Sequence, residues 1–259
     1  MDPERAAQVD VAADAGESFG RYAVVDEAAL FPHLSSVHLA CGFHAGDPAG
    51  LRRSIARAVE AGLALGAHPG YRDLVGFGRR HMSLSTDELF ADVLYQLGAL
   101  GALVAVAGGR LHHVKAHGAL YNDMHANERL ADTVARAVAA YRPDLPLVLL
   151  AGPGGAMARA AAGRVGVRVV TEAFPDRAYL ASGELAPRSM DGAVISDPEH
   201  VARRAVAFAT GASVPALGGG EVTVTAETLC VHGDGPGAPA VAAAVREALT
   251  AAGVAVRPF

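Results

Sequence analysis

The chain has 259 residues, of which 51% are hydrophobic and 19% are charged, a balance typical of a globular protein with a large core. This composition excludes a mini-protein and a wholly disordered chain. The formal net charge of −5, without a run of basic residues, argues against nucleic acid as a partner.

Short apolar or β-branched runs alternate with longer segments of helical periodicity along the whole chain. The predicted strands cover residues 9–13, 37–40, 64–67, 113–115, 148–151, 168–171 and 229–231, and the main predicted helices cover 52–60, 85–106, 128–141, 198–210 and 238–252. Helix starts are indicated by Asp47 and Asp197, each followed by Pro, and by the capping-box spacing of Ser85 and Glu88.

This alternation predicts an α/β fold with parallel strands and crossover helices. Seven strand–helix units favour a (β/α) barrel, incomplete at seven strands, over an open doubly wound sheet. The Gly run at residues 218–220 is short enough for a hairpin turn or a surface loop, so no linker is indicated. We expect residues 1–259 to form one barrel domain.

The two cysteines, Cys41 and Cys230, are far apart in sequence and lie in apolar surroundings, which favours a reducing compartment. The segment that starts at Met1 is polar and acidic, unlike a signal peptide, and charges or Gly interrupt every long apolar run. We therefore expect a cytoplasmic protein without membrane insertion.

Polar and titratable residues concentrate just after the predicted strands, where barrel enzymes build their active sites. The candidates are Asp14, Glu17, His44, His68, Arg79, Lys115, His117, Tyr121, Asn122, His232 and Asp234, with Glu172, Asp176, Arg177 and Arg188 following the sixth strand. The pattern predicts a functional site at this rim.

One carboxylate and two imidazoles with open coordination positions would hold a divalent metal ion and activate water. Asp14, His44 and His117 form the natural trio, each following a different strand. The alternative is that these imidazoles bond to substrate or backbone, because no paired His motif requires a shared ion.

Lys115 and His117 are two residues apart at the end of a strand, so both side chains point to one face. Either could act as an acid, a base or a carboxylate anchor. The structural alternative is an ion pair between Lys115 and Asp14 or Glu17.

Two glycine-containing loops differ in what they indicate. The loop at 67–80 carries Arg79 and could fold over a small anion, and the segment at 232–237 is a candidate for substrate contact. The segment at 152–155 precedes a helix but has no Lys-Ser/Thr, which argues against ATP binding by this chain alone.

Six motifs together carry a family resemblance over residues 7–252. They are DAGESFG at 14–20, ACGFHAGDP at 40–48, GAHPGY at 66–71, GFGRR at 76–80, HVKAHGALYN at 113–122 and CVHGD at 230–234. The chain resembles the LamB/YcsF family, the A subunit of the bacterial ATP-hydrolysing 5-oxoprolinase. It departs from the family pattern at Ala12, where Asn is usual, and at Ala116, where Pro is usual.

The resemblance implies that the lactam of 5-oxoproline is opened to L-glutamate with hydrolysis of ATP to ADP and phosphate. It also implies partner subunits B and C, which would bind ATP and phosphorylate the lactam, leaving this chain to hydrolyse the activated product. The family is similar in fold to the seven-stranded glycoside hydrolase/deacetylase barrels, which often hold a metal with one Asp and two His.

On this basis the residues divide into two sets. Candidate catalytic residues are Asp14, His44, Lys115 and His117, and candidate substrate-binding residues are Glu17, His68, Arg79, Tyr121, Asn122, His232 and Asp234.

Two other functions remain open. A stand-alone metal-dependent deacetylase or amidohydrolase acting on a small N-acyl or carbohydrate substrate would use the same residues and need no ATP. A carbohydrate- or lactam-binding module would bind without turnover, even with partners supplied.

Overall fold

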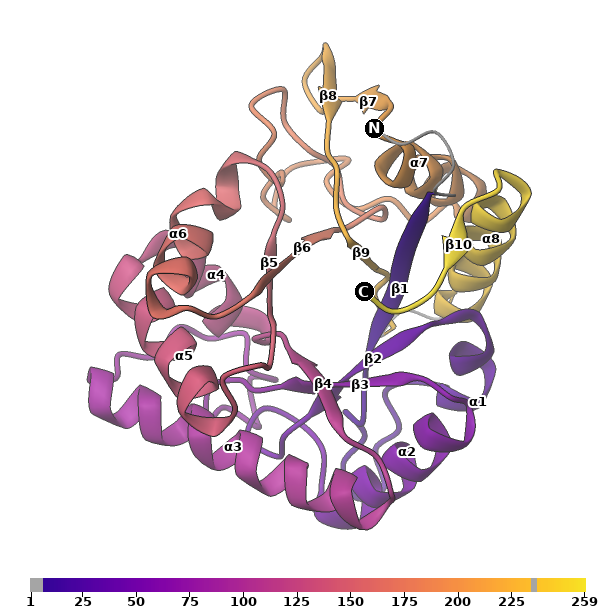
Figure 1. Ribbon diagram of the computed structural model, residues 1–259. Coiled ribbons are helices and arrows are strands. Elements are labelled where there is room, and N and C mark those ends of the chain that lie inside the picture. Colours follow the sequence, from indigo (N-terminus) through magenta and orange to yellow (C-terminus); the bar gives the residue numbers. More distant parts are fainter. Residues whose placement is uncertain (1–6, 234–236) are drawn as a thin grey trace.

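The computed structural model describes residues 7–233 and 237–259, and within them seven parallel strands close into a barrel (Figure 1). Around the barrel they are β1 (Gln8–Ala15), β2 (Ser36–Ala40), β3 (Ala64–His68), β4 (Leu111–Val114), β5 (Leu147–Leu150), β6 (Val169–Ala173) and β9 (Thr228–Cys230). Strand β1 pairs with β2 on one side and with β9 on the other, which closes the barrel. The seven-stranded barrel predicted from the sequence is confirmed.

Helices surround the barrel and complete the α/β architecture (Figure 1). They include α2 (Pro48–Glu60), α3 (Thr86–Val106), α5 (Glu128–Tyr141), α6 (Ala156–Val165), α7 (Pro198–Thr210) and α8 (Ala238–Ala251). The side chains of Asp47 and Asp197 accept hydrogen bonds from the first turns of α2 and α7, and Ser85 and Glu88 form a capping box at α3. All three predicted helix starts are confirmed.

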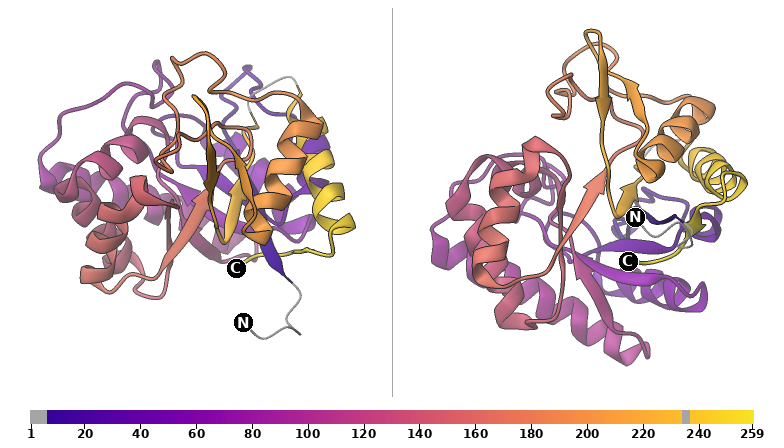
Figure 2. Two further views of the ribbon diagram at one scale, coloured as in Figure 1. Left: turned by 90° about the horizontal axis from the view of Figure 1, so that it is seen from above. Right: turned by 45° about the horizontal axis from the view of Figure 1, so that its top comes forward.

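Several short elements were not predicted as such. They are α1 (Glu27–Leu30), the 3-10 turns η1 (Phe31–His33) and η2 (Pro153–Gly155), α4 (Gly118–Ala126) and β10 (Ala255–Val256). Strands β7 (Ser213–Pro215) and β8 (Glu221–Thr223) form an antiparallel hairpin that stands away from the barrel (Figure 2). Of the two options for residues 218–220, the hairpin turn is the one observed.

Helix α3 has the length and hydropathy of a membrane span. It also has a stripe of buried side chains, including Leu89, Val93, Leu97 and Leu100, and it packs against α5. A core helix of a barrel meets the same length and hydropathy criterion, so α3 alone does not indicate a membrane.

The interior of the barrel is polar, in contrast to the branched aliphatic filling common in such barrels. Along β1, Val9 and Val11 join the hydrophobic core, whereas the alternate residue Asp10 turns inward. Its carboxylate accepts hydrogen bonds from three hydroxyl groups: those of Ser35, Ser36 and Thr228, at 2.6, 2.7 and 2.6 Å. These bonds link β1 to the strand on each side.

The loop after β6, residues 174–197, has a small core of its own. Ala178, Ala186 and Ala193 are buried there, and Leu180 and Leu217 pack against them. Backbone bridges join Arg177 to Val194 and Tyr179 to Leu185. The packed loop holds its residues in fixed positions above the barrel.

Candidate active site

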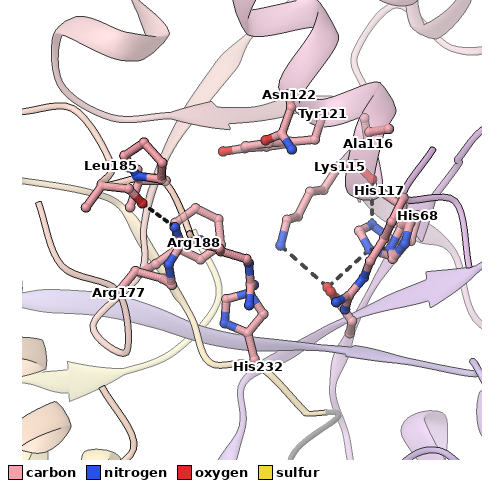
Figure 3. A pocket seen from close by; sticks show the side chains of 17 residues that line it. His68, Lys115, Ala116, His117, Tyr121, Asn122, Arg177, Leu185, Arg188 and His232 are labelled. Atoms are coloured by element: carbon pink, nitrogen blue, oxygen red, sulfur yellow. Dashed lines mark hydrogen bonds and ion pairs between the residues drawn. The ribbon is translucent and has the colours of Figure 1, made fainter. Parts of the chain in front are cut away.

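A cavity of about 480 Å³ opens at the carboxyl-terminal ends of the barrel strands (Figure 3). Its polar and aromatic lining comprises Asp14, His68, Arg79, Lys115, His117, Tyr121, Asn122, Phe174, Arg177, Arg188 and His232. Eight of the eleven predicted catalytic and substrate-binding residues therefore line one cavity. Glu17 and His44 are buried beside it without lining it, and Asp234 lies outside the described residues.

Two imidazoles face each other at one end of the cavity. His68 contributes Nδ1 to a hydrogen bond with the carbonyl oxygen of Lys115 at 2.8 Å, and His117 contributes Nε2 to one with the carbonyl oxygen of Phe77 at 2.8 Å. Carbonyl oxygens only accept, so each of these nitrogens carries a proton. In the neutral rings the remaining nitrogens, His68 Nε2 and His117 Nδ1, then present lone pairs to each other at 3.0 Å.

A third imidazole and a carboxylate complete this group. His44 stacks on His117, with ring centres 3.7 Å apart and planes 3° from parallel. Glu17 Oε1 lies 3.2 Å from His44 Nε2 and 3.4 Å from His117 Nδ1. Gly78 makes this packing possible, because a Cβ at that position would lie 2.7 Å from the Cβ of His44.

His44 and His117 are neutral at pH 7. Burial, reinforced by the nearby His68, lowers the pKa of His117 to about 3. Burial also lowers the pKa of His44 well below its usual value and that of His38, the next imidazole in the barrel, to about 3. Neutral imidazole is the form that binds metal ions.

The donor atoms of Glu17, His44, His68 and His117 lie within 4.8 Å of one another, so this buried cluster could hold a metal ion. The lone pairs of His68 Nε2 and His117 Nδ1 repel each other, and the nearby Glu17 oxygen, unless a cation or a proton lies between them. Two imidazoles and a carboxylate are ligands that suit a divalent ion. Of the predicted trio, His44 and His117 belong to this group. Asp14 belongs to a second group with His38 and Cys230, and its Oδ1 lies 3.3 Å from His68 Nε2.

Lys115 points into the centre of the cavity from the end of β4 (Figure 3). Its Nζ lies 3.0 Å from Glu172 Oε1, 3.4 Å from Asp14 Oδ1 and 3.0 Å from Cys230 Sγ. Burial opposes the charge, but Asp14 and the other acidic neighbours outweigh it and raise the pKa of Lys115 well above its usual value. Lys115 is therefore an ammonium ion at pH 7 and cannot serve as a base.

Glu172 was expected at this rim but was placed in neither the catalytic nor the substrate-binding set. It is fully buried in β6, and burial raises its pKa although Lys115 opposes the shift. The sequence signal was a single acidic residue at the end of an otherwise apolar or hydroxyl-bearing strand. The expected ion pair of Lys115 forms with Asp14, and Glu172 is its second partner.

The two departures from the family pattern have defined places. Ala12 is buried in β1, in register with Ser36 and Cys230, so a larger polar residue there would lie in the barrel interior below Asp14. Ala116 is buried and lines the cavity. Asp14 keeps its contacts with Lys115, His38 and His68 beside these alanines.

A seven-stranded parallel barrel with imidazoles, carboxylates and an ammonium group at its carboxyl-terminal rim defines the structural class. A crystal structure from Enterococcus faecalis V583, 12% identical, aligns over 98% of both chains with a TM-score of 0.56, which shows the fold alone. The chain belongs to the LamB/YcsF family, whose model matches residues 9–259.

Relatives at higher identity cover almost the whole chain. A Thermus thermophilus protein described as the A subunit of 5-oxoprolinase is 54% identical over 97% of this chain and 100% of its own length. A Heliobacterium modesticaldum protein with the same description is 49% identical over 96% of this chain and 97% of its own length. The crystal structure of a lactam utilization protein from T. thermophilus is 54% identical and aligns over 97% of this chain and 100% of that chain with a TM-score of 0.93.

Proposed function

We propose that this chain is the A subunit of an ATP-dependent 5-oxoprolinase and hydrolyses an activated lactam to L-glutamate. The observation that carries the proposal is a cavity with Lys115 and Asp14 at its centre and the neutral imidazole of His117 on its wall, in a chain 54% identical to a protein described as this 5-oxoprolinase component. We further propose that the whole chain is one domain and acts in the cytoplasm.

The chemistry explains why ATP is needed. An unstrained lactam is a poor electrophile, and transfer of a phosphoryl group from ATP to its carbonyl oxygen makes the ring carbon susceptible to water. Attack of water at that carbon and cleavage of the C–N bond, with the nitrogen leaving as an amine, give an acyl phosphate of glutamate. A second water hydrolyses this acyl phosphate to glutamate and inorganic phosphate. Lys115, held cationic by Asp14 and Glu172, stabilises the negative charge that develops on oxygen.

The proton of the attacking water goes to a group that lines the cavity and is unprotonated at pH 7. Asp14 meets both conditions, because the neighbouring His68 and Lys115 hold its pKa well below its usual value despite burial. His117 meets them when its Nδ1 holds no metal ion, since its Nε2–H donates to the carbonyl oxygen of Phe77. Glu17 and His44 lie behind the cavity wall, and we assign them to holding His117 in place.

We also propose that Glu17, His44, His68 and His117 hold a divalent metal ion. When bound, such an ion supplies Lewis acidity that lowers the pKa of water. Loss of the ion after His44→Ala, measured by elemental analysis of the purified chain, supports this assignment. Full metal content in that variant contradicts it.

ATP is assigned to the partner subunits, which we propose are subunits B and C. The relatives are described as one subunit of an enzyme, which supports a complex with other chains. In this chain the carbonyl oxygens of Leu150 and Gly152 accept hydrogen bonds from the guanidinium of Arg159, which occupies the loop before α6. That loop has no Lys or Ser/Thr for phosphate and Mg²⁺.

The test is release of glutamate from 5-oxoproline by the chain alone, with ATP, and with ATP and both partner subunits. We expect release only in the third mixture, and His117→Ala in that mixture should lower turnover by roughly 10²-fold. ATP-dependent release by the chain alone would refute the division of labour.

The metal-binding cluster supports one other function, a stand-alone metal-dependent amidohydrolase. The same assay separates it from the first, since such an enzyme would open an amide without ATP. Removal of the metal by a chelator would then abolish turnover by the isolated chain.

A further inference from the structure

A second group of charged side chains lies at the end of the cavity opposite the histidines (Figure 3). It comprises Arg177 and Arg188 from the loop after β6, His232 from the loop after β9, and Asp176, which contacts the imidazole of His232. The proposed hydrolysis uses none of these groups, and of the four only His232 was expected to touch substrate.

Asp176, His232 and Arg188 form a hydrogen-bonded chain. His232 Nδ1–H donates to the carboxylate of Asp176. The backbone N–H of His232 donates to the same carboxylate at 3.3 Å. Arg188 Nη2–H then donates to His232 Nε2 at 2.7 Å. A guanidinium has donors only, so this bond requires the lone pair of Nε2 and fixes the tautomer of His232.

The chain runs from the protein interior to the cavity. Asp176 is 7% exposed and His232 is half-buried against the ring of Phe174, whereas Arg188 is exposed. The buried carboxylate therefore orients a guanidinium at the surface. Within the described residues Arg188 makes this one hydrogen bond, which leaves four of its five N–H groups for a ligand.

The neighbouring Arg177 is committed to structure. Its Nη2 donates to the carbonyl oxygen of Ala186 at 2.6 Å and its Nε donates to that of Ala193 at 3.3 Å. Its charge still counts: with Arg177 and Arg188 beside the single carboxylate of Asp176, this end of the cavity has a net positive charge. On the histidine side one guanidinium, that of Arg79, lines the cavity, and the carboxylate of Glu17 is buried behind the wall.

We propose that Arg188 binds the carboxylate of the lactam substrate, and that Asp176 and His232 are positioning residues that orient it. This inference rests on the proposed function. A guanidinium fork matches a carboxylate in two parallel hydrogen bonds. Phe174 and Leu185 line the cavity beside it and offer apolar surface to the methylene groups of the ring. With its carboxylate at Arg188, the lactam directs its carbonyl group towards Lys115.

Arg79 is the competing anchor because it also lines the cavity. It lies on the histidine side, with its guanidinium carbon 5.4 Å from the ring centre of Phe77, whose carbonyl oxygen bonds to His117. A carboxylate at Arg79 would bring the lactam carbonyl to Lys115 from the histidine side of the cavity. The two anchors therefore predict opposite orientations of the substrate.

The experiment compares two probes of the same ring, 5-oxoproline and 2-pyrrolidinone, which lacks the carboxylate. Their affinities for the isolated full-length chain are measured by NMR titration in wild type, Arg188→Gln, Arg79→Gln and the remote surface control Arg203→Gln. We expect Arg188→Gln to weaken binding of 5-oxoproline by about 10- to 100-fold, the loss of a charged hydrogen-bonded pair, with 2-pyrrolidinone unaffected. Arg203→Gln should change neither affinity.

A double-mutant cycle tests the positioning role. His232→Leu should weaken binding of 5-oxoproline but not of 2-pyrrolidinone, and by less than Arg188→Gln does. Added to Arg188→Gln, it should have no further effect. Equal losses for both probes would show that the changes are merely structural and would overturn the proposal.

Three results separate this inference from the function on which it rests. Unchanged 5-oxoproline binding in Arg188→Gln, or a selective loss in Arg79→Gln instead, would overturn the Arg188 site and leave the lactam function standing. If wild type binds 5-oxoproline no more tightly than 2-pyrrolidinone, the carboxylate site is overturned, and release of glutamate in the mixture with ATP and both partner subunits then decides the lactam function.

Discussion

Replacement of Lys115 by Met is the most direct test of the charges at the centre of the cavity. At 3.0 and 3.4 Å from Glu172 and Asp14, the ammonium interacts with each carboxylate by about 5 kcal/mol at an effective dielectric constant of about 20, before the cost of burial is subtracted. Lys115→Met leaves two buried carboxylates without this partner. We expect a loss of about 3–5 kcal/mol in the free energy of unfolding at pH 7.

The assay is urea unfolding followed by circular dichroism, with the exposed Arg203→Met as the control. Adding Glu172→Gln to Lys115→Met should recover part of the loss, because it removes the more deeply buried carboxylate. The deficit of Lys115→Met should also shrink as the pH falls from 8 to 5. Without Lys115 the pKa of Glu172 rises further, and a carboxyl group whose folded pKa is raised favours the folded state at low pH. A single variant within about 1 kcal/mol of wild type, or a double variant less stable than the single, would refute this reasoning.

Three further outcomes follow from the geometry. His38 and His117 are buried with pKa values of about 3, so the stability that they contribute above pH 6.5 is lost as the pH falls. Together they should lower the free energy of unfolding by about 3 kcal/mol between pH 7.5 and 5.5. A constant unfolding midpoint over that range would contradict this. Gly66→Ala places a Cβ 2.1 Å from the imidazole of His113 and should destabilise the fold by about 1–3 kcal/mol. Gly98→Ala, in open space on α3, should stabilise the fold by up to about 1 kcal/mol. Equal melting temperatures for the two variants would argue against both expectations. Zinc at about 100 times its dissociation constant should add about 3 kcal/mol to wild type and much less to Glu17→Gln, and equal gains would place the ion elsewhere.

The sequence predicted those features of the fold whose signals are local. Asp47 and Ser85 begin their helices because a capping side chain acts within three residues of itself. Helix α4 was not predicted because it starts only a few residues after β4, at Gly118 with φ of +53°, and His117 before it makes no side-chain cap. From the sequence, Tyr121 is therefore expected only to follow a strand, whereas the structure places it on α4.

The site was predictable as a rim but not as a set of partners. Strand ends identified Asp14, His44 and His117 individually, whereas contacts between distant strands decided which atoms meet. Glu17 joins the imidazoles, and Glu172 reaches Lys115, only because barrel closure brings these loops and strands together. The roles of all these residues, and the single-domain organisation, stay predictions.

The carboxylate of Asp10 makes the first strand of the barrel depend on one of the last. Its hydrogen bond to Thr228 joins residues 218 positions apart, and β1 gains its second neighbour only when β9 pairs with it. During synthesis, β1 and its Asp14 therefore remain at an open sheet edge until nearly the whole chain has left the ribosome. Such long-range pairing is slow to form and leaves strand edges exposed meanwhile. A chain released before β9 is made lacks the strand that joins β1 to β6, and these two strands carry Asp14 and Glu172, the two carboxylate partners of Lys115.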